Sequence, residues 1–290
     1  MEFLRPSIAR WKTIKRVVMF FLGTVLCASL SLDGLANISI INGLTHEKKA
    51  SPGETYDTII TIQNSGEKEV RLKIYQADFS FDFEGNQYYT EAGKLERSNA
   101  AWLSYYPRNA VIPAGEIFEA KCQVNVPSEA ALIGTYWSLI MIEPLPEADA
   151  EKAEAKQDEV SLGITQGVRY AVQIITHIQD TGTRQINFLN TEVLKKEGKK
   201  FLQVDVENTG ERWLKPVLYV EIYNNKGEYV GKFEGGKWRI YPGTSVRYRV
   251  DLTHIPPGEY KALILVDNLD EHVFGTESTF NFAPCCNLLR

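Results

Sequence analysis

Side chains that could do acid–base or metal chemistry are few in this chain and far apart. The 290 residues include only four histidines, and none of them stands beside a nucleophile or at a metal-ligand spacing. No Gly-x-Ser-x-Gly, His-Glu-x-x-His, P-loop or dinucleotide-binding glycine pattern occurs. The sequence therefore predicts no catalytic residue, no metal site and no cofactor. It favours a binding protein over an enzyme.

Cysteine chemistry is equally limited. Beyond residue 36 the cysteines are Cys122, Cys285 and Cys286, an odd number without a Cys-x-x-Cys spacing. Cys122 falls on an alternating apolar face with Phe118 and Val124, so we expect a buried thiol that behaves as a small hydrophobe. For the tail pair, a disulfide and a tail without function are both open.

Residues 168–178 offer a different kind of interaction, main-chain hydrogen bonding to a strand of another protein. Residues 168–178 alternate, so that Val168, Tyr170, Val172 and Ile174 project to one face of a strand. The stretch follows a charged segment that we expect to be mobile. A strand so placed near a sheet edge can accept a strand from another chain. Arg169 could then hold a partner's carboxylate with its guanidinium fork; the alternatives are a solvated Arg169 and an ordinary last strand of a sandwich.

An internal sequence repeat indicates which elements surround this strand. An Asn-x-Gly turn, a Pro/Gly turn and a Gly-x-Tyr entry to an apolar strand occur twice in the same order. The first set lies at 61–67, 112–116 and 133–143, and the second at 205–211, 241–244 and 257–267. A period of about 125–145 residues is the size of a whole domain, so the repeat predicts two similar domains side by side.

Short alternating strands with turn signals between them fill both halves and predict an all-β fold of two tandem β-sandwiches. We expect an N-terminal sandwich over 37–180, with an acidic loop at 147–159, and a C-terminal sandwich over 184–290. Within them we expect hairpins across residues 64–66 and across 225–227.

The first 36 residues have the order of a signal peptide. Basic side chains at 10–16 precede an apolar run at 17–30, and Gly34 and Ala36 supply small residues for cleavage. We therefore expect a periplasmic mature protein; an uncleaved membrane anchor is the alternative, although the apolar run is short for a spanning helix. The net charge of −5 argues against nucleic acid as the partner.

Motifs of the first half resemble those of the periplasmic pilus-assembly chaperones, the PapD-like proteins. They are Ser51-Pro-Gly-Glu, Ile62-Gln-Asn-Ser-Gly, Trp102-Leu-Ser-Tyr-Tyr-Pro, Ile112-Pro-Ala-Gly-Glu, Gly134-Thr-Tyr-Trp-Ser-Leu and Arg169-Tyr-Ala-Val. The resemblance covers the first domain well and the second only in style. It implies two immunoglobulin-like sandwiches that form a boomerang.

The resemblance also implies a partner and a site. In that family the last strand of the first domain lends alternating apolar side chains to a pilin, and a basic pair in the cleft holds the pilin's C-terminal carboxylate. Arg169 matches one member of the pair, and Lys48 or Lys49 is the candidate for the other. The expected partner is an exported pilin-like or surface subunit, with an outer-membrane usher as a further candidate. The alternative function is a structural or adhesive envelope protein that binds a surface protein or a glycan.

Overall fold

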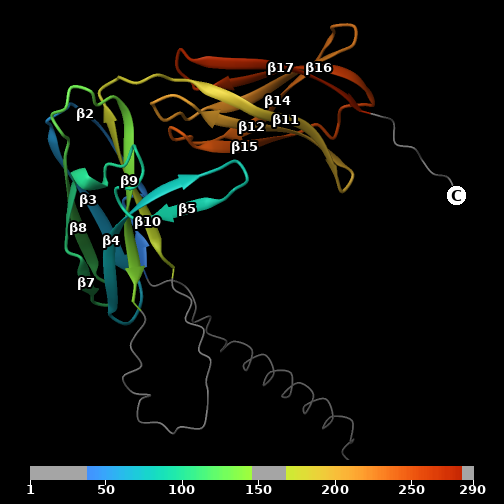
Figure 1. The fold of residues 1–290 in the computed structure, drawn as a ribbon. Coiled ribbons are helices and arrows are strands. Elements are labelled where there is room, and N and C mark those ends of the chain that lie inside the picture. Colours follow the sequence, from blue (N-terminus) through green and yellow to red (C-terminus); the bar gives the residue numbers. More distant parts are fainter. Residues whose placement is uncertain (1–37, 146–167, 283–290) are drawn as a thin grey trace, which may run out of the picture.

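The computed structural model describes residues 38–145 and 168–282. The expected signal peptide, the acidic loop at 147–159 and the pair Cys285 and Cys286 lie outside the described residues. Among the described residues, the one helix is a three-residue 3-10 turn, Ala100–Trp102 (η2), and no helix is long and apolar enough to cross a membrane. All other regular elements are strands, which form two sandwiches set at an angle (Figure 1). The predicted all-β, two-sandwich fold is confirmed.

Domain one consists of two sheets that pack face to face. One sheet has the strand order β1-β3-β8-β6, and the other has the order β2-β10-β9-β4, with β5 and β7 also paired to β4. The strands are β1 (Ile38–Ile40), β2 (Thr45–Ala50), β3 (Thr55–Asn64), β4 (Val70–Phe81), β5 (Gln87–Thr90), β6 (Leu103–Tyr106), β7 (Asn109–Ile112), β8 (Ile117–Asn125), β9 (Gly134–Pro144) and β10 (Tyr170–Ile178). Alternate residues such as Ile60, Leu72 and Val172 face inward and form one core.

Domain two has the sheets β11-β12-β15 and β14-β13-β16-β17. Its strands are β11 (Ile186–Lys196), β12 (Lys199–Asn208), β13 (Val217–Asn224), β14 (Tyr229–Lys237), β15 (Ser245–Asp251), β16 (Gly258–Asp267) and β17 (Val273–Phe282). Leu202, Val220 and Tyr248 are among its fully buried core side chains. The predicted hairpin across 225–227 joins β13 to β14 and is confirmed.

The two Asn-x-Gly motifs have the same structure. Asn64 and Asn208 are both fully buried. Each amide donates to the carbonyl four residues on, Lys68 O at 2.7 Å and Arg212 O at 2.8 Å. Each also accepts the N–H two residues on and donates to the Pro/Gly-turn segment, at Ile112 O or Ile240 O. A repeated sequence motif is therefore a repeated hydrogen-bonded corner.

That corner explains a prediction that is wrong. The expected hairpin across 64–66 would have paired β3 with β4, but β3 pairs with β1 and β8, while β4 lies in the other sheet. The Asn64 side chain ties the turn to Ile112 and Pro113, so the chain crosses between the sheets here instead of folding back.

Cys122 lies on β8 and faces the core, as predicted. Its exposed fraction is 1%. Burial raises the pKa of the thiol to about 12. The thiolate that would react with an electrophile is therefore scarce at neutral pH.

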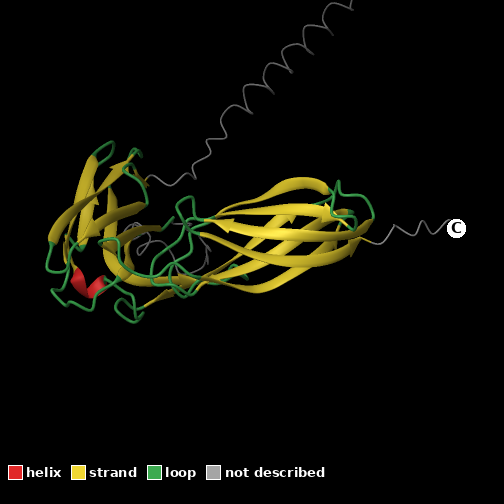
Figure 2. Cartoon of the chain, turned by 90° about the horizontal axis from the view of Figure 1, so that it is seen from above, coloured by secondary structure: helices red, strands yellow, loops and turns green. Residues whose placement is uncertain are grey.

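An aromatic cluster joins the two domains. Trp137 of β9 stacks on Tyr241 of domain two, with ring centroids 4.6 Å apart. Trp213 lies against the same tyrosine at 5.6 Å, and Ile175 of β10 completes the buried cluster. In Figure 2 loops gather between the strands of domain one and the strands of domain two. The domains therefore share a small hydrophobic core of their own.

The β4–β5 hairpin makes a second connection. It leaves domain one and reaches toward domain two (Figure 1). At its tip, the Phe83 amide donates to Ser245 Oγ at 3.1 Å, and the Arg247 guanidinium lies 4.9 Å from the Phe83 ring. Arg247 is itself fixed by two hydrogen bonds to the buried carboxylate of Asp205, at 2.6 and 2.7 Å. Two separated contacts thus set the angle between the sandwiches.

Candidate functional site

Strand β10 is paired along its whole length on one side and along only part of it on the other. Antiparallel pairing with β9 runs from Tyr170↔Ile142 to Ile178↔Gly134. Parallel pairing with β2 runs only from Gln173↔Thr45 to Ile178↔Ala50. Among the described strands, none pairs with the first part of β10 on the β2 side. We call residues 168–172 on that side the open half-edge.

The register identifies the main-chain groups that face outward there. The N–H of Gln173 donates to Leu44 O at 2.9 Å, on the β2 side. Because main-chain groups alternate in direction along a strand, Ala171 and Arg169 point their N–H and C=O groups to the same side. Tyr170 and Val172 point theirs to β9. The open half-edge therefore offers two donors and two acceptors to an added strand.

The side chains of the predicted binding face lie largely inside domain one. Val172 and Ile174 are buried in its core, and the hydroxyl of the half-buried Tyr170 donates to Ile38 O. In this conformation none of the three extends an apolar side chain to a partner. Val168 is 44% exposed and is the one predicted apolar side chain that a partner could reach.

The two predicted basic residues are far apart. Arg169 is exposed at the start of β10, where its Nη1 donates to the Tyr75 hydroxyl at 3.3 Å. Lys48 stands opposite Thr176, seven residues along β10 from Arg169. At about 3.3 Å per residue, Arg169 and Lys48 therefore lie ~23 Å apart along the strand. The structure does not bring them together. Arg169 precedes Ile175 of the interdomain cluster by six residues along β10, so the expected basic pair in one cleft is not formed.

Domain two supplies groups near the open half-edge that sequence reasoning missed. Arg239 donates to Thr45 Oγ1 at 2.7 Å, and the Tyr241 hydroxyl donates to Gln173 Oε1 at 2.5 Å. Both contacts lie at the first residue pair of β2 and β10, Thr45 and Gln173, next to the open half-edge. Leu44 and Trp238 are exposed large side chains next to these contacts in the sequence. No local pattern links Arg239 to Thr45, because 194 residues separate them.

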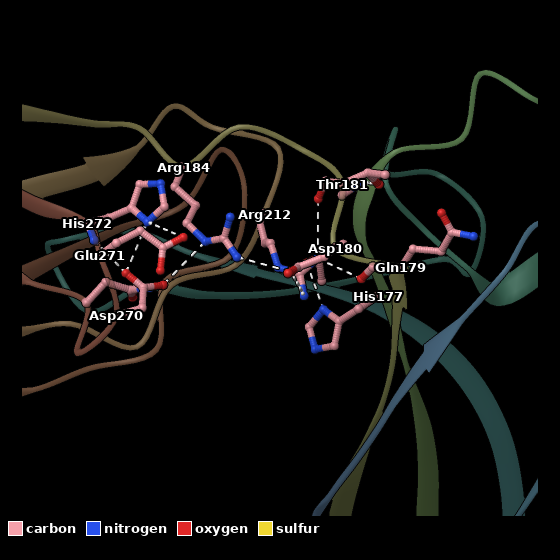
Figure 3. A network of polar contacts seen from close by, with 12 residues as sticks. His177, Gln179, Asp180, Thr181, Arg184, Arg212, Asp270, Glu271 and His272 are labelled. Carbon is pink, nitrogen blue, oxygen red and sulfur yellow. Dashed lines mark hydrogen bonds and ion pairs between the residues drawn. The ribbon is translucent and has the colours of Figure 1, made fainter.

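An ion-pair network surrounds the short connection between the domains (Figure 3). Asp180 pairs with Arg212 at 3.3 Å and with Arg184 at 3.2 Å. Arg184 also reaches Asp270 at 3.4 Å, and His272 lies 3.1 Å from the same carboxylate. Nearby positive charges, first that of Lys49 and then that of Arg212, lower the pKa of Asp180.

Three side chains of metal-ligating types lie together at the acidic end of this network. Ligand atoms of Asp270, Glu271 and His272 lie within 4.8 Å of one another. However, the Asp270 carboxylate already accepts hydrogen bonds from Asn268 and from the His272 backbone. Adjacent, solvent-facing residues of a turn that bond to one another explain the grouping.

Comparison with known proteins gives the following similarities. No family model matches the chain, and no curated protein matches it. Among solved structures, a chain of a chaperone–tip adhesin complex of CFA/I fimbriae biogenesis is 13% identical, with a TM-score of 0.45; the match covers 84% of this chain and 98% of that one. The class 5 fimbriae chaperone CfaA is 13% identical (TM-score 0.44; 86% and 100% covered).

A chain of the CsuC–CsuE chaperone–tip adhesion subunit complex of Acinetobacter baumannii is 12% identical (TM-score 0.44; 83% and 98% covered). All three similarities are weak in identity and in superposition.

Proposed function

We propose that this chain binds an exported protein subunit by strand addition at the open half-edge of β10, and that it acts as a periplasmic chaperone in the assembly of a pilus or similar surface fibre. The half-paired state of β10 is the observation that carries the proposal. The sequence resemblance of domain one to the PapD-like chaperones supplies the class of partner, a pilin-like subunit. An outer-membrane usher is a further partner in the same proposal.

The energetics suit reversible binding. Two donors and two acceptors could form four hydrogen bonds, each with a net contribution of about 0.5–1.5 kcal/mol, so main-chain pairing supplies about 2–6 kcal/mol. Val168 at one end of the open half-edge and Leu44 at the other are both exposed. They add apolar contact with a partner. Affinity beyond this depends on side chains of the partner. A short open edge thus holds a subunit without committing it permanently.

A proline substitution tests the open half-edge directly. Ala171→Pro removes an N–H that points away from β9, and a proline is tolerated at such an edge position. The control is Ala171→Val, which keeps the N–H and has a side chain of similar volume. We expect Ala171→Pro to weaken subunit binding by 5-fold or more, since a hydrogen bond of about 1 kcal/mol or more is lost and the added ring obstructs pairing.

The assay is recovery of exported proteins with a tagged chain from the periplasmic fraction, quantified by mass spectrometry for wild type and both variants. A single subunit that is lost with Ala171→Pro and kept with Ala171→Val supports the proposal. Equal recovery with all three would exclude pairing at this edge. It would leave a structural or adhesive envelope protein as the better interpretation, with the exposed Tyr88 and Tyr89 of β5 as contact residues.

Arg169→Ala tests the predicted carboxylate contact separately. The residue is exposed, so the fold should be unchanged. If Arg169 pairs with a partner's carboxylate, binding should weaken by about 2–5 kcal/mol. A change below about 0.5 kcal/mol would show that its hydrogen bond to Tyr75 is its whole role.

A further inference from the structure

His177 is a buried titratable side chain at the boundary between the two domains. It lies near the end of β10 with an exposed fraction of 7%. Its Nδ1 is 3.0 Å from Thr135 Oγ1 of β9, and its Nε2 is 3.6 Å from Glu47 of β2. The Trp213 ring of domain two lies 5.2 Å away. Figure 3 shows His177 at the domain-one end of the ion-pair network.

Thr135 links His177 to domain two. Its Oγ1 accepts the main-chain N–H of Trp213 at 3.1 Å, a hydrogen bond between the domains. Nε2 of His177 faces the Glu47 carboxylate, so in the neutral ring the hydrogen belongs on Nε2. Nδ1 is then an acceptor, and the Thr135 hydroxyl donates its one hydrogen to it. A second proton, on Nδ1, would force the Thr135 hydroxyl to turn its hydrogen away and reorganise this contact.

The surrounding charges also oppose a proton on the ring. Lys215 and Arg212 of domain two are the cations that act on it, and Lys49 stands beside it in the β2 register. Glu47 is the carboxylate that faces the ring, and it is already held by Lys215 at 3.1 Å. Asp180, further along the joint, is paired with Arg212 and Arg184. Protonated His177 would thus compete with Lys215 for one anion.

We propose that His177 is an acid-sensitive latch, which holds the two domains together while it is neutral and releases them when it takes up a proton. The inference goes beyond strand binding and does not depend on it. Release would separate Trp137 from Tyr241 and break the hydrogen bond from Trp213 to Thr135. Both are contacts that fix domain two beside the open half-edge.

The expected size of the effect follows from the two protonation equilibria. Burial, with a contribution from Arg212, lowers the pKa of His177 from 6.5 to about 4 in the closed form. A ring exposed by opening would regain the ordinary value. The ratio of open to closed molecules therefore rises as the pH falls, by roughly 60-fold between pH 7 and pH 4.5 and by at most about 300-fold.

Amide hydrogen exchange measures the opening. The Thr135 and Trp213 amides both donate across the interface, to Glu211 O at 2.9 Å and to Thr135 Oγ1. We expect their protection factors in the wild type to fall by roughly 60-fold between pH 7 and pH 4.5. Core amides such as Ile60 and Val220 should keep theirs. At pH 4.5 a Glu47 carboxyl that opening frees, with its ordinary pKa of 4.5, also takes up protons and adds at most about two-fold to this fall.

His177→Asn is the test variant, because Asn keeps an acceptor near the Nδ1 position and does not titrate. Its interface amides should lose no more than the roughly two-fold protection that Glu47 accounts for, while the control variant His254→Asn should behave as the wild type. If the His177→Asn variant does not fold, Lys215→Gln is the second test variant. Without the competing cation, protonated His177 can pair with Glu47, so the loss should shrink. The latch is overturned if the wild-type interface amides stay protected at pH 4.5. It is also overturned if both variants reproduce the wild-type loss.

Discussion

Truncating the buried asparagine of either corner should destabilise the protein strongly. Asn208 makes three hydrogen bonds to main-chain groups: it donates to Arg212 O and Ile240 O and accepts from the Gly210 N–H. Asn208→Ala leaves all three groups without that partner in a site that excludes water. At about 1–1.5 kcal/mol for each, the free energy of unfolding should fall by about 3–5 kcal/mol. Asn64→Ala should cost at least a similar amount in domain one, because Asn64 makes the three equivalent hydrogen bonds and a fourth to Pro113 O.

Urea unfolding at pH 7, followed by far-ultraviolet circular dichroism, gives the free energies. Asn281→Ala is the control, since Asn281 is exposed on β17, and its effect should stay within about 0.5 kcal/mol. Losses below about 1 kcal/mol for Asn208→Ala and Asn64→Ala would refute the reasoning. They would mean that water or a shifted turn satisfies the main-chain groups as well as the asparagine does.

Three further outcomes are expected. Cys122 should resist alkylation in the native protein, and Cys122→Ser should cost about 1–3 kcal/mol by urea unfolding, because a hydroxyl replaces a buried thiol; rapid native labelling would contradict its burial. Gly134→Ala should disrupt the joint, since φ is +77° and an added Cβ would lie 2.2 Å from Glu211 O; Gly115→Ala, with φ +75° and nothing within 4 Å, is the matched control. Small-angle scattering should therefore show an expanded shape for the first variant alone. Finally, stability should fall with acid between about pH 6.5 and 4. The unfolded state binds more protons there, because the native pKa of His177 is about 4. The contribution of His177 should approach about 3 kcal/mol. It should be missing from His177→Asn, which keeps only the smaller loss near pH 4 from carboxyls with lowered pKa values, such as Glu47.

Local patterns were sufficient to predict the fold class and the two sandwiches, although not every strand pairing. Alternation identified the long strands, because one face of each must be apolar. The Asn-x-Gly and Pro/Gly turns identified the repeat, because each needs particular residue types. The same reasoning placed Cys122 in the core. It did not find β2, which reads Thr-His-Glu-Lys-Lys-Ala, because that strand is held by main-chain pairing to β10 and shows no apolar alternation.

The candidate site was only partly predictable. Alternation along residues 168–178 separates two faces but does not say which one is inside. Here Val172 lies in the core of domain one, and Ile175, on the opposite face, lies in the interdomain cluster. The open half-edge exists because β2 begins only at Thr45, opposite Gln173, and that is a property of the register. Arg239 and Tyr241 reach the site from domain two by contacts that no short-range pattern encodes.

The aromatic cluster between the domains has a consequence for the order of synthesis. Trp137 and Ile175 belong to domain one, but their partners Trp213 and Tyr241 come later in the chain. At about 5–20 residues per second, the roughly 60 residues between Ile178 and Tyr241 take ~3–12 seconds to emerge. During that interval a domain one that had already folded would present a tryptophan-bearing patch to every neighbour. Until domain two covers this patch, the chain itself is therefore a substrate for chaperones that bind exposed apolar surface.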